Sequence, residues 1–231
     1  MTESLIDLAR ATLEPLDAPA RFVCSCVIGP EPDDPDVDVD EWIALDFAVA
    51  RRMVEGGTPV VLRVSASELA SAPALDGLLL EVSLDGTGDD ERQAQAIKLA
   101  RAIDHGLPVR AALATGATGI DAYRSCGIAR RVLGSRVSVR VRWDEVLDIK
   151  GAALALSFGA DELAGPLAPR VERLKLAQFG EASGASRGVT DEAVPRRLPV
   201  SVGGPPEPSH RPSPAYVEQL IRAAGRQPVR R

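Results

Sequence analysis

The sequence predicts an α/β protein: an incomplete or open (βα) barrel of about five parallel strands, followed by a C-terminal tail. Short apolar runs of strand length alternate with stretches of helical periodicity, the pattern of βαβ crossovers and a mainly parallel sheet. The middle runs are continuously apolar, as in strands that are covered on both faces. A closed eight-stranded barrel takes about 250 residues. This chain has 231 residues and only a few clear strand runs, so we expect the barrel to stay open.

Five apolar runs carry the prediction of a sheet, and each is rich in Val, Leu or Ile. They cover residues 22–28, 59–64, 77–84, 108–113 and 136–143. The last run alternates between valines and polar side chains, which indicates one face toward water or a polar pocket. The alternation sets Val137, Val139 and Val141 against Ser138, Arg140 and Arg142. We therefore expect residues 136–143 to form an edge strand.

Three intervals between these runs show helical periodicity, and each ends at a glycine, a residue that commonly terminates helices. The three glycines are Gly56, Gly106 and Gly134. The apolar faces are formed by Trp42, Leu45, Val49 and Met53, by Ala96, Ile97, Ala100 and Ile103, and by Ile120, Ile128, Val132 and Leu133.

The composition changes after residue 168. Residues 1–168 hold the expected barrel domain, residues 169–214 read as a Pro/Gly-rich linker, and residues 215–231 as a C-terminal helix with a basic tail. The helix carries a narrow apolar stripe, formed by Val217, Leu220 and Ile221, that could dock on the barrel domain.

Charge is distributed unevenly along the chain. Residues 1–168 contain 16 Lys and Arg against 27 Asp and Glu, whereas residues 169–231 contain 11 against 6. An acidic body argues against a nucleic-acid groove, which needs clustered cations. The basic tail could contact an acidic partner or simply be a solvated surface. We expect neither a membrane span nor a signal peptide, because no apolar run is long enough and the start of the chain is acidic.

Cysteine and histidine are scarce, which limits the possible chemistry. Cys24, Cys26 and Cys126 make an odd number, so we expect no disulfide framework and a reduced, cytoplasmic protein. With only His105 and His210 to help them, the cysteines lack the donors of a zinc or cluster site. We expect no metal, no cofactor and no catalytic residue of the Cys-His or Ser-His-Asp type.

Two glycine-containing loops follow predicted strands and are the candidate ligand site. Their backbone N–H groups lead into helix N-termini at the carboxyl edge of a parallel sheet, where ligands usually bind. The spacing matches neither the Walker loop nor the dinucleotide fingerprint, and ordinary turns and helix caps remain the alternative. The candidate residues are Gly86, Thr87, Gly88, Thr115, Gly116, Thr118 and Gly119.

Two stretches resemble the radical S-adenosylmethionine enzymes of futalosine-route menaquinone synthesis. The first stretch, residues 116–165, contains residues 119–133 and 150–165 with the segment LALSFGADEL, and is similar to a late barrel region of aminofutalosine synthase and dehypoxanthine futalosine cyclase. Residues 216–229, YVEQLIRAAGRQPV, are similar to the end of the same enzymes. The deazaflavin cofactor synthase is a weaker match. The resemblance implies a barrel framework.

The chain departs from this family at the reactive centre. The family carries C-x-x-x-C-x-x-C after its first strand, whereas this chain has only Cys24-x-Cys26 and is much shorter. The resemblance therefore implies a degenerate relative that does not perform radical chemistry. We expect a non-catalytic partner or regulator of an active radical enzyme, or self-association through the open sheet edge. The alternative is an enzyme or binding protein for a nucleoside-like or phosphorylated ligand at the glycine loops.

Overall fold

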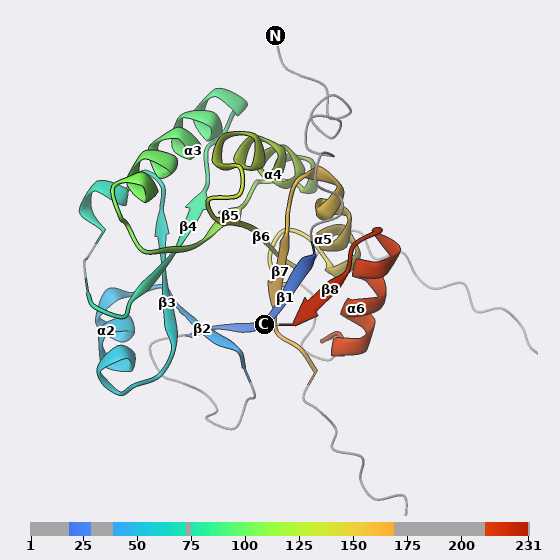
Figure 1. Cartoon of the computed structure of the whole chain (residues 1–231), viewed down its shortest axis with the longest axis horizontal. Coiled ribbons are helices and arrows are strands. Elements are labelled where there is room, and N and C mark those ends of the chain that lie inside the picture. Colours follow the sequence, from blue (N-terminus) through green and yellow to red (C-terminus); the bar gives the residue numbers. More distant parts are fainter. Residues whose placement is uncertain (1–18, 29–38, 73–74, 169–210, 231) are drawn as a thin grey trace, which may run out of the picture.

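The computed structural model describes residues 19–28, 39–72, 75–168 and 211–230. Eight strands form one sheet, in the order β2-β3-β4-β5-β6-β7-β1-β8, and every pairing is parallel. A further pairing of β1 with β2 closes the first seven strands into a barrel (Figure 1). The strands are β1 (Ala20–Ile28), β2 (Glu41–Ala44), β3 (Val60–Ser65), β4 (Leu79–Leu84), β5 (Val109–Ala114), β6 (Ser138–Arg142), β7 (Glu162–Gly165) and β8 (Pro228–Arg230).

Helices surround this barrel on the outside (Figure 1). They are α2 (Phe47–Glu55), α3 (Asp89–Asp104), α4 (Gly119–Leu133), α5 (Ile149–Ala155) and α6 (Pro214–Ala223), with two short 3-10 turns, η1 (Leu69–Ser71) and η2 (Leu156–Phe158). Side-chain caps fix where several of them begin. The Thr118 hydroxyl accepts a hydrogen bond from the Asp121 N–H while the Asp121 carboxylate accepts one from the Thr118 N–H, the reciprocal capping box. Gly134 ends α4, as the sequence predicts.

The barrel-like parallel α/β fold is confirmed, but the open five-stranded form is wrong. All five predicted strands are present, and the structure adds β2, β7 and β8. These three strands have only three or four residues each, too short to stand out as apolar runs. Trp42, expected on a helix, lies in β2, and the helix α2 begins five residues later.

The expectation of an open edge at residues 136–143 is also wrong. β6 pairs with β5 on one side and with β7 on the other, so its backbone groups are satisfied within the barrel. Val139 and Val141 belong to the apolar core between barrel and helices. β6 therefore offers no free edge through which the chain could self-associate.

The first strand has a divided edge. Its second half, Ser25 to Ile28, pairs with β2, whereas its beginning, Ala20 to Phe22, pairs with β8 on that flank. β7 pairs with the other flank of the strand. The last described residues of the chain thus complete the barrel wall where β2 does not reach.

Helix α6 is anchored to the barrel rather than set apart from it. Val217 and Ile221 are fully buried in the core, and Ser213 caps the helix by accepting a hydrogen bond from the Tyr216 N–H at 3.3 Å. The docking stripe expected from the sequence therefore has a partner. Most of the expected linker, residues 169–210, lies outside the described residues, so the proposed domain boundaries stay a prediction.

No helix in the described part of the chain is long and apolar enough to cross a lipid bilayer.

Candidate functional site

The interior of the barrel is lined by charged side chains instead of a packed apolar layer. Six strands each contribute one of them, and three arginines face three glutamates. We call this set the lumen network: Glu41 of β2, Arg63 of β3, Glu81 of β4, Arg110 of β5, Arg140 of β6 and Glu162 of β7. Ordinary barrels fill this space with branched apolar residues. The charged interior is therefore the feature of this chain that most needs an explanation.

Arg140 is the centre of the lumen network. Its side chain is completely buried, and its Nε donates a 2.6 Å hydrogen bond to Glu162. One terminal nitrogen donates to Glu81 at 2.8 Å and forms a shorter ion pair with Glu41. A single guanidinium thus joins carboxylates from three strands. Burial alone would lower the pKa of Arg140, but the three carboxylates outweigh it and the pKa is raised.

Arg110 reaches the lumen because of a β-bulge. The register of β4 and β5 shifts so that Leu80 pairs with Val109 while Glu81 pairs with Ala111, and Arg110 is left unpaired between them. Its guanidinium pairs with Glu162 at 3.0 Å and with Glu41 at 3.4 Å.

Arg63 extends the lumen network toward the carboxyl ends of the strands. Its Nε donates to Glu81 at 2.6 Å, and a terminal nitrogen donates to Glu145, after β6, at 2.7 Å. Burial raises the pKa of Glu81, but Arg140 and Arg63 outweigh that effect and the pKa is lowered. Glu81 therefore stays ionised inside the barrel.

At the carboxyl ends of the strands, polar groups continue beyond the lumen network. Arg142 is buried, donates to Ser25 Oγ at 2.8 Å and pairs with Asp144 at 2.8 Å. The Ser65 hydroxyl donates to Asp85 at 2.9 Å, and the amide of Gln95 donates to the other oxygen of Asp85 at 2.9 Å. We call this group the carboxyl-terminal mouth. It lies where barrel proteins commonly bind their ligands.

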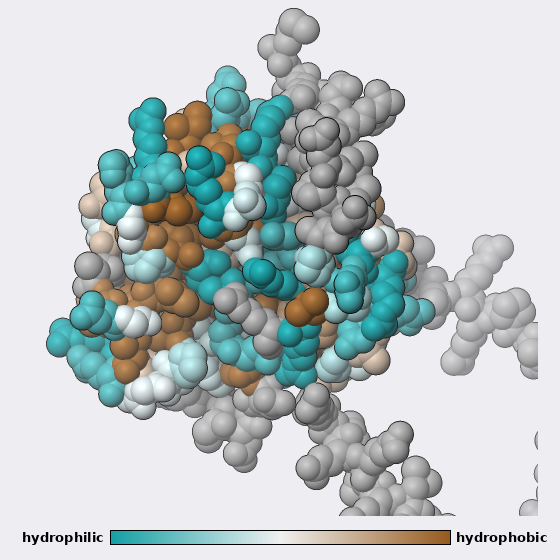
Figure 2. Space-filling model, in the orientation of Figure 1, coloured by the Kyte–Doolittle hydropathy of each residue, from teal (hydrophilic) through white to brown (hydrophobic). Residues whose placement is uncertain are grey.

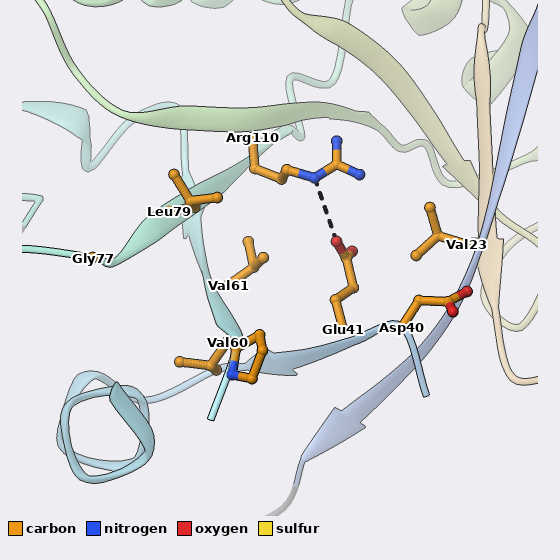
Figure 3. Close-up of a pocket in the computed structure, with 9 residues that line it drawn as sticks. Val23, Asp40, Glu41, Val60, Val61, Gly77, Leu79 and Arg110 are labelled. Carbon is orange, nitrogen blue, oxygen red and sulfur yellow. Dashed lines mark ion pairs between the residues drawn. The ribbon is translucent and has the colours of Figure 1, made fainter. Parts of the chain in front are cut away.

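At the opposite end, the strands begin around a cavity of about 330 Å³, which we call the amino-terminal mouth. Figure 3 shows apolar side chains of β1, β3 and β4 on its walls and the Glu41–Arg110 pair at its floor. Figure 2 shows apolar residues gathered over β3 and β4 on the same side of the molecule. The lining residues are Val23, Asp40, Glu41, Pro59, Val60, Val61, Gly77, Leu79 and Arg110.

The two predicted ligand loops are neighbours at the carboxyl-terminal mouth, as expected from their positions after β4 and β5. The Thr115 hydroxyl donates a 3.0 Å hydrogen bond to the Leu84 carbonyl, which links one loop to the strand before the other. Gly86 and Gly116 allow close approach of the following helices, because a Cβ would lie 2.9 Å and 2.4 Å from atoms of α3 and α4 respectively. Thr118 and Gly119 begin α4, and Gly88 is the N-cap residue of α3.

Carboxylates of the chain itself occupy donors of both loops. Thr87 donates to Glu91 from its N–H at 2.8 Å and from its hydroxyl at 2.9 Å. The N–H of Thr118 donates to Asp121 at 3.1 Å. These hydrogen bonds from the threonines lower the pKa of Glu91 and of Asp121, so both side chains are anionic at neutral pH. Ligand binding by the seven loop residues stays a prediction, and the two carboxylates disfavour a phosphorylated ligand.

The described cysteines lie away from both mouths. Cys24 belongs to the apolar core between the barrel and the helices, and Cys126 lies inside α4 in the same core. Burial raises the pKa of the Cys126 thiol to about 12. Among the described residues, no group of three or more His, Cys, Asp and Glu side chains is arranged to hold a metal ion.

Residues that carry the family resemblance converge at one place. Arg130 donates to the Gly159 carbonyl at 2.8 Å and pairs with Asp161 at 2.9 Å. Asp161 in turn accepts a 2.7 Å hydrogen bond from the Val139 N–H, and Arg226 is buried nearby within its electrostatic reach. The two similar stretches, far apart in sequence, thus meet beside β6 and β7, where their charged side chains interact.

Comparison with models of protein families and with curated proteins finds no match to this chain. The resemblance to the radical enzymes therefore rests on the residues of the chain itself.

Most of the lumen network was missed by reading the sequence. Of its six members, the strand alternation pointed only to Arg140. A usable signal was present, because a single charged residue interrupts several otherwise apolar runs, as Arg63 does in VVLRVS and Glu81 in LLEVSL. Such a charge needs a buried partner, and partners of opposite sign on neighbouring strands indicate a polar lumen.

Proposed function

We propose that this chain is a non-catalytic relative of the futalosine-pathway radical enzymes, acting as a partner or regulator of an active enzyme of that group. The observation that carries the proposal is the lumen network. A radical enzyme of this type needs an open chamber for cluster, cofactor and substrate, whereas here arginines and glutamates of six strands occupy the barrel centre.

The electrostatics of the lumen network favour a scaffold over an acid–base catalyst. A general acid or base works best with a pKa near the working pH. In this barrel the pKa of Glu81 is lowered and that of Arg140 is raised, so both shifts lead away from neutrality. Glu81 and Arg140 therefore hold strands together and are poor proton carriers.

Two measurements test the proposal. The chain is reconstituted anaerobically with iron and sulfide, and its iron content and visible absorbance are measured. It is then added to aminofutalosine synthase and to dehypoxanthine futalosine cyclase, and turnover and complex formation are followed. We expect no stoichiometric iron and a change in the turnover of one enzyme. Stoichiometric iron would show a radical enzyme, and the absence of any complex or change with both enzymes would refute the partner role.

A second candidate is binding of a nucleoside-like ligand at the carboxyl-terminal mouth. The observation that favours it is the Ser65–Asp85–Gln95 cluster, which offers a carboxylate with well-fixed partners beside the Gly86 loop. Hydroxyl groups of a ribose are suitable donors to such a carboxylate. Since Glu91 and Asp121 place negative charge at both loops, an unphosphorylated nucleoside fits better than a nucleotide.

A calorimetric titration with adenosine and with adenosine monophosphate tests this candidate. We expect adenosine to bind more tightly than the monophosphate. Asp85→Asn should weaken adenosine binding, whereas Asp90→Asn in the first turn of α3 serves as a control that should leave it unchanged. Tighter binding of the monophosphate would contradict the reasoning from the two carboxylates.

A further inference from the structure

The amino-terminal mouth has an unfilled inner layer. Leu79 lies in β4 opposite Val61 of β3, and both line the cavity. Side chains that point into a small barrel normally fill it and are buried. Val61 follows this rule with 4% exposure, but Leu79 is 40% exposed. A large apolar side chain at the mouth of the lumen therefore borders open space instead of a packing partner.

The floor of the cavity is shaped by the β-bulge at Arg110. Bulges re-aim a side chain at the cost of a ladder hydrogen bond and are frequent beside binding sites. The bulge places the Arg110 guanidinium over the start of β2, where it meets Glu41 (Figure 3). A cavity of about 330 Å³ with apolar walls and a few fixed polar groups matches the general form of small-ligand sites.

The charges around the cavity are already balanced. Glu41 pairs with Arg110 and with Arg140, while Arg110 also pairs with Glu162. Asp40 accepts a 2.8 Å hydrogen bond from the Cys24 N–H and pairs with Arg230 of β8 at 3.2 Å. Because these groups are already paired, a charged ligand would either stay without a counter-charge or break one of these pairs, and both are costly in a partly buried site.

We propose that the amino-terminal mouth binds a compact, uncharged ligand with an apolar body and one hydrogen-bonding end. The apolar body packs on Val23, Val61 and Leu79, and the polar end contacts the Asp40–Arg230 or Glu41–Arg110 pair. This site lies at the opposite end of the barrel from the carboxyl-terminal mouth, so it stands or falls independently of the function proposed above.

Three probes with the same ring and different head groups test the charge argument. Cyclohexanol, cyclohexylammonium and cyclohexanecarboxylate are titrated into the intact chain, and binding is followed by methyl NMR. We expect cyclohexanol to bind about tenfold more tightly than either ion. Nuclear Overhauser contacts from the ring to the methyl groups of Val23, Val61 and Leu79 should locate it in the unmodified protein. Equal or tighter binding of either ion would overturn the proposal.

Two tryptophan variants test the location. Leu79→Trp should fill the mouth and reduce cyclohexanol binding at least about tenfold, because the ring then occupies the ligand's space. Ile97→Trp, on α3, is the matched control, since Ile97 is 37% exposed against 40% for Leu79 and does not line the cavity. Undiminished binding by Leu79→Trp would place the site elsewhere. If Leu79→Trp does not fold, the Overhauser contacts decide, and their absence at millimolar cyclohexanol would refute the site.

Discussion

Replacing Arg140 with methionine should expose how the charged lumen is held together. The substitution keeps an unbranched side chain but removes the guanidinium that joins Glu41, Glu81 and Glu162. Each carboxylate keeps one other partner: Glu81 keeps Arg63 at 2.6 Å, and both other glutamates keep Arg110. Three buried carboxylates would then share two guanidiniums, which leaves one negative charge without compensation.

The cost follows from that single uncompensated charge. Removing one partner of a buried ion pair costs about 3–5 kcal/mol of unfolding free energy. For a chain of this size, each kcal/mol lowers the midpoint of thermal unfolding by about 2–4 °C. We therefore expect Arg140→Met to unfold roughly 6–20 °C lower at neutral pH, as followed by circular dichroism. Arg222→Met removes an exposed Arg–Glu pair on α6 and should change the unfolding free energy by only about 0.5 kcal/mol.

The pH dependence of the stability loss in Arg140→Met tests the reasoning more sharply than the size of that loss. In the unmodified chain the pKa of Glu81 is lowered, so this group stabilises the fold above its unfolded pKa of about 4.3 and the contribution is lost as the pH falls through the folded pKa. Without Arg140, the three carboxylates share two guanidiniums, so the uptake of one proton by this cluster removes the uncompensated charge. The penalty of Arg140→Met should shrink between about pH 7 and about pH 5. A loss under about 1 kcal/mol, or one that is equal at both pH values, would refute the reasoning.

Three further predictions concern the packing around the barrel. Gly116→Ala should lower the unfolding free energy by about 1–3 kcal/mol, because its Cβ would lie 2.4 Å from an atom of α4, whereas Gly56→Ala, with no atom nearer than 3.4 Å, should be nearly neutral in urea titrations. Ile221→Ala should cost about 2–5 kcal/mol and exposed Leu154→Ala less than about 0.5 kcal/mol; equal effects would mean that α6 is not docked in solution. Cys126, with a pKa of about 12, should resist iodoacetamide in the folded protein and react in urea, and mass spectrometry of the labelled peptide would reveal any reaction without denaturant.

The sequence predicted the elements that are long and periodic. Continuous apolar runs located β1, β3, β4, β5 and β6, and the terminating glycines located the ends of α2 and α4. The alternation in β6 correctly separated the valines from Arg140 and Arg142. Such patterns indicate local burial, and each of these elements buries enough apolar surface to produce a recognisable pattern in the sequence.

Barrel closure could not be predicted, because it depends on short strands whose stability comes from their neighbours. In the segment LALSFGADEL only three residues separate η2 from β7, and the four residues of the strand are extended through their pairing with β1 and β6. β2 begins with Glu41, a residue that disfavours strands until Arg110 and Arg140 neutralise it. The lumen network could not be predicted for the same reason, since its charged side chains come from six strands that are distant in sequence.

The divided edge of β1 has a consequence for how the chain is made. Ala20 donates a 2.9 Å hydrogen bond to the carbonyl of Gln227, so the beginning of the first strand depends on residues that are translated much later. Until β8 has left the ribosome, the beginning of the first strand has backbone groups with no sheet partner, and contacts this distant in sequence form slowly. Nascent chains stalled before residue 228 should therefore bind chaperones more strongly and resist protease less than chains that extend beyond β8.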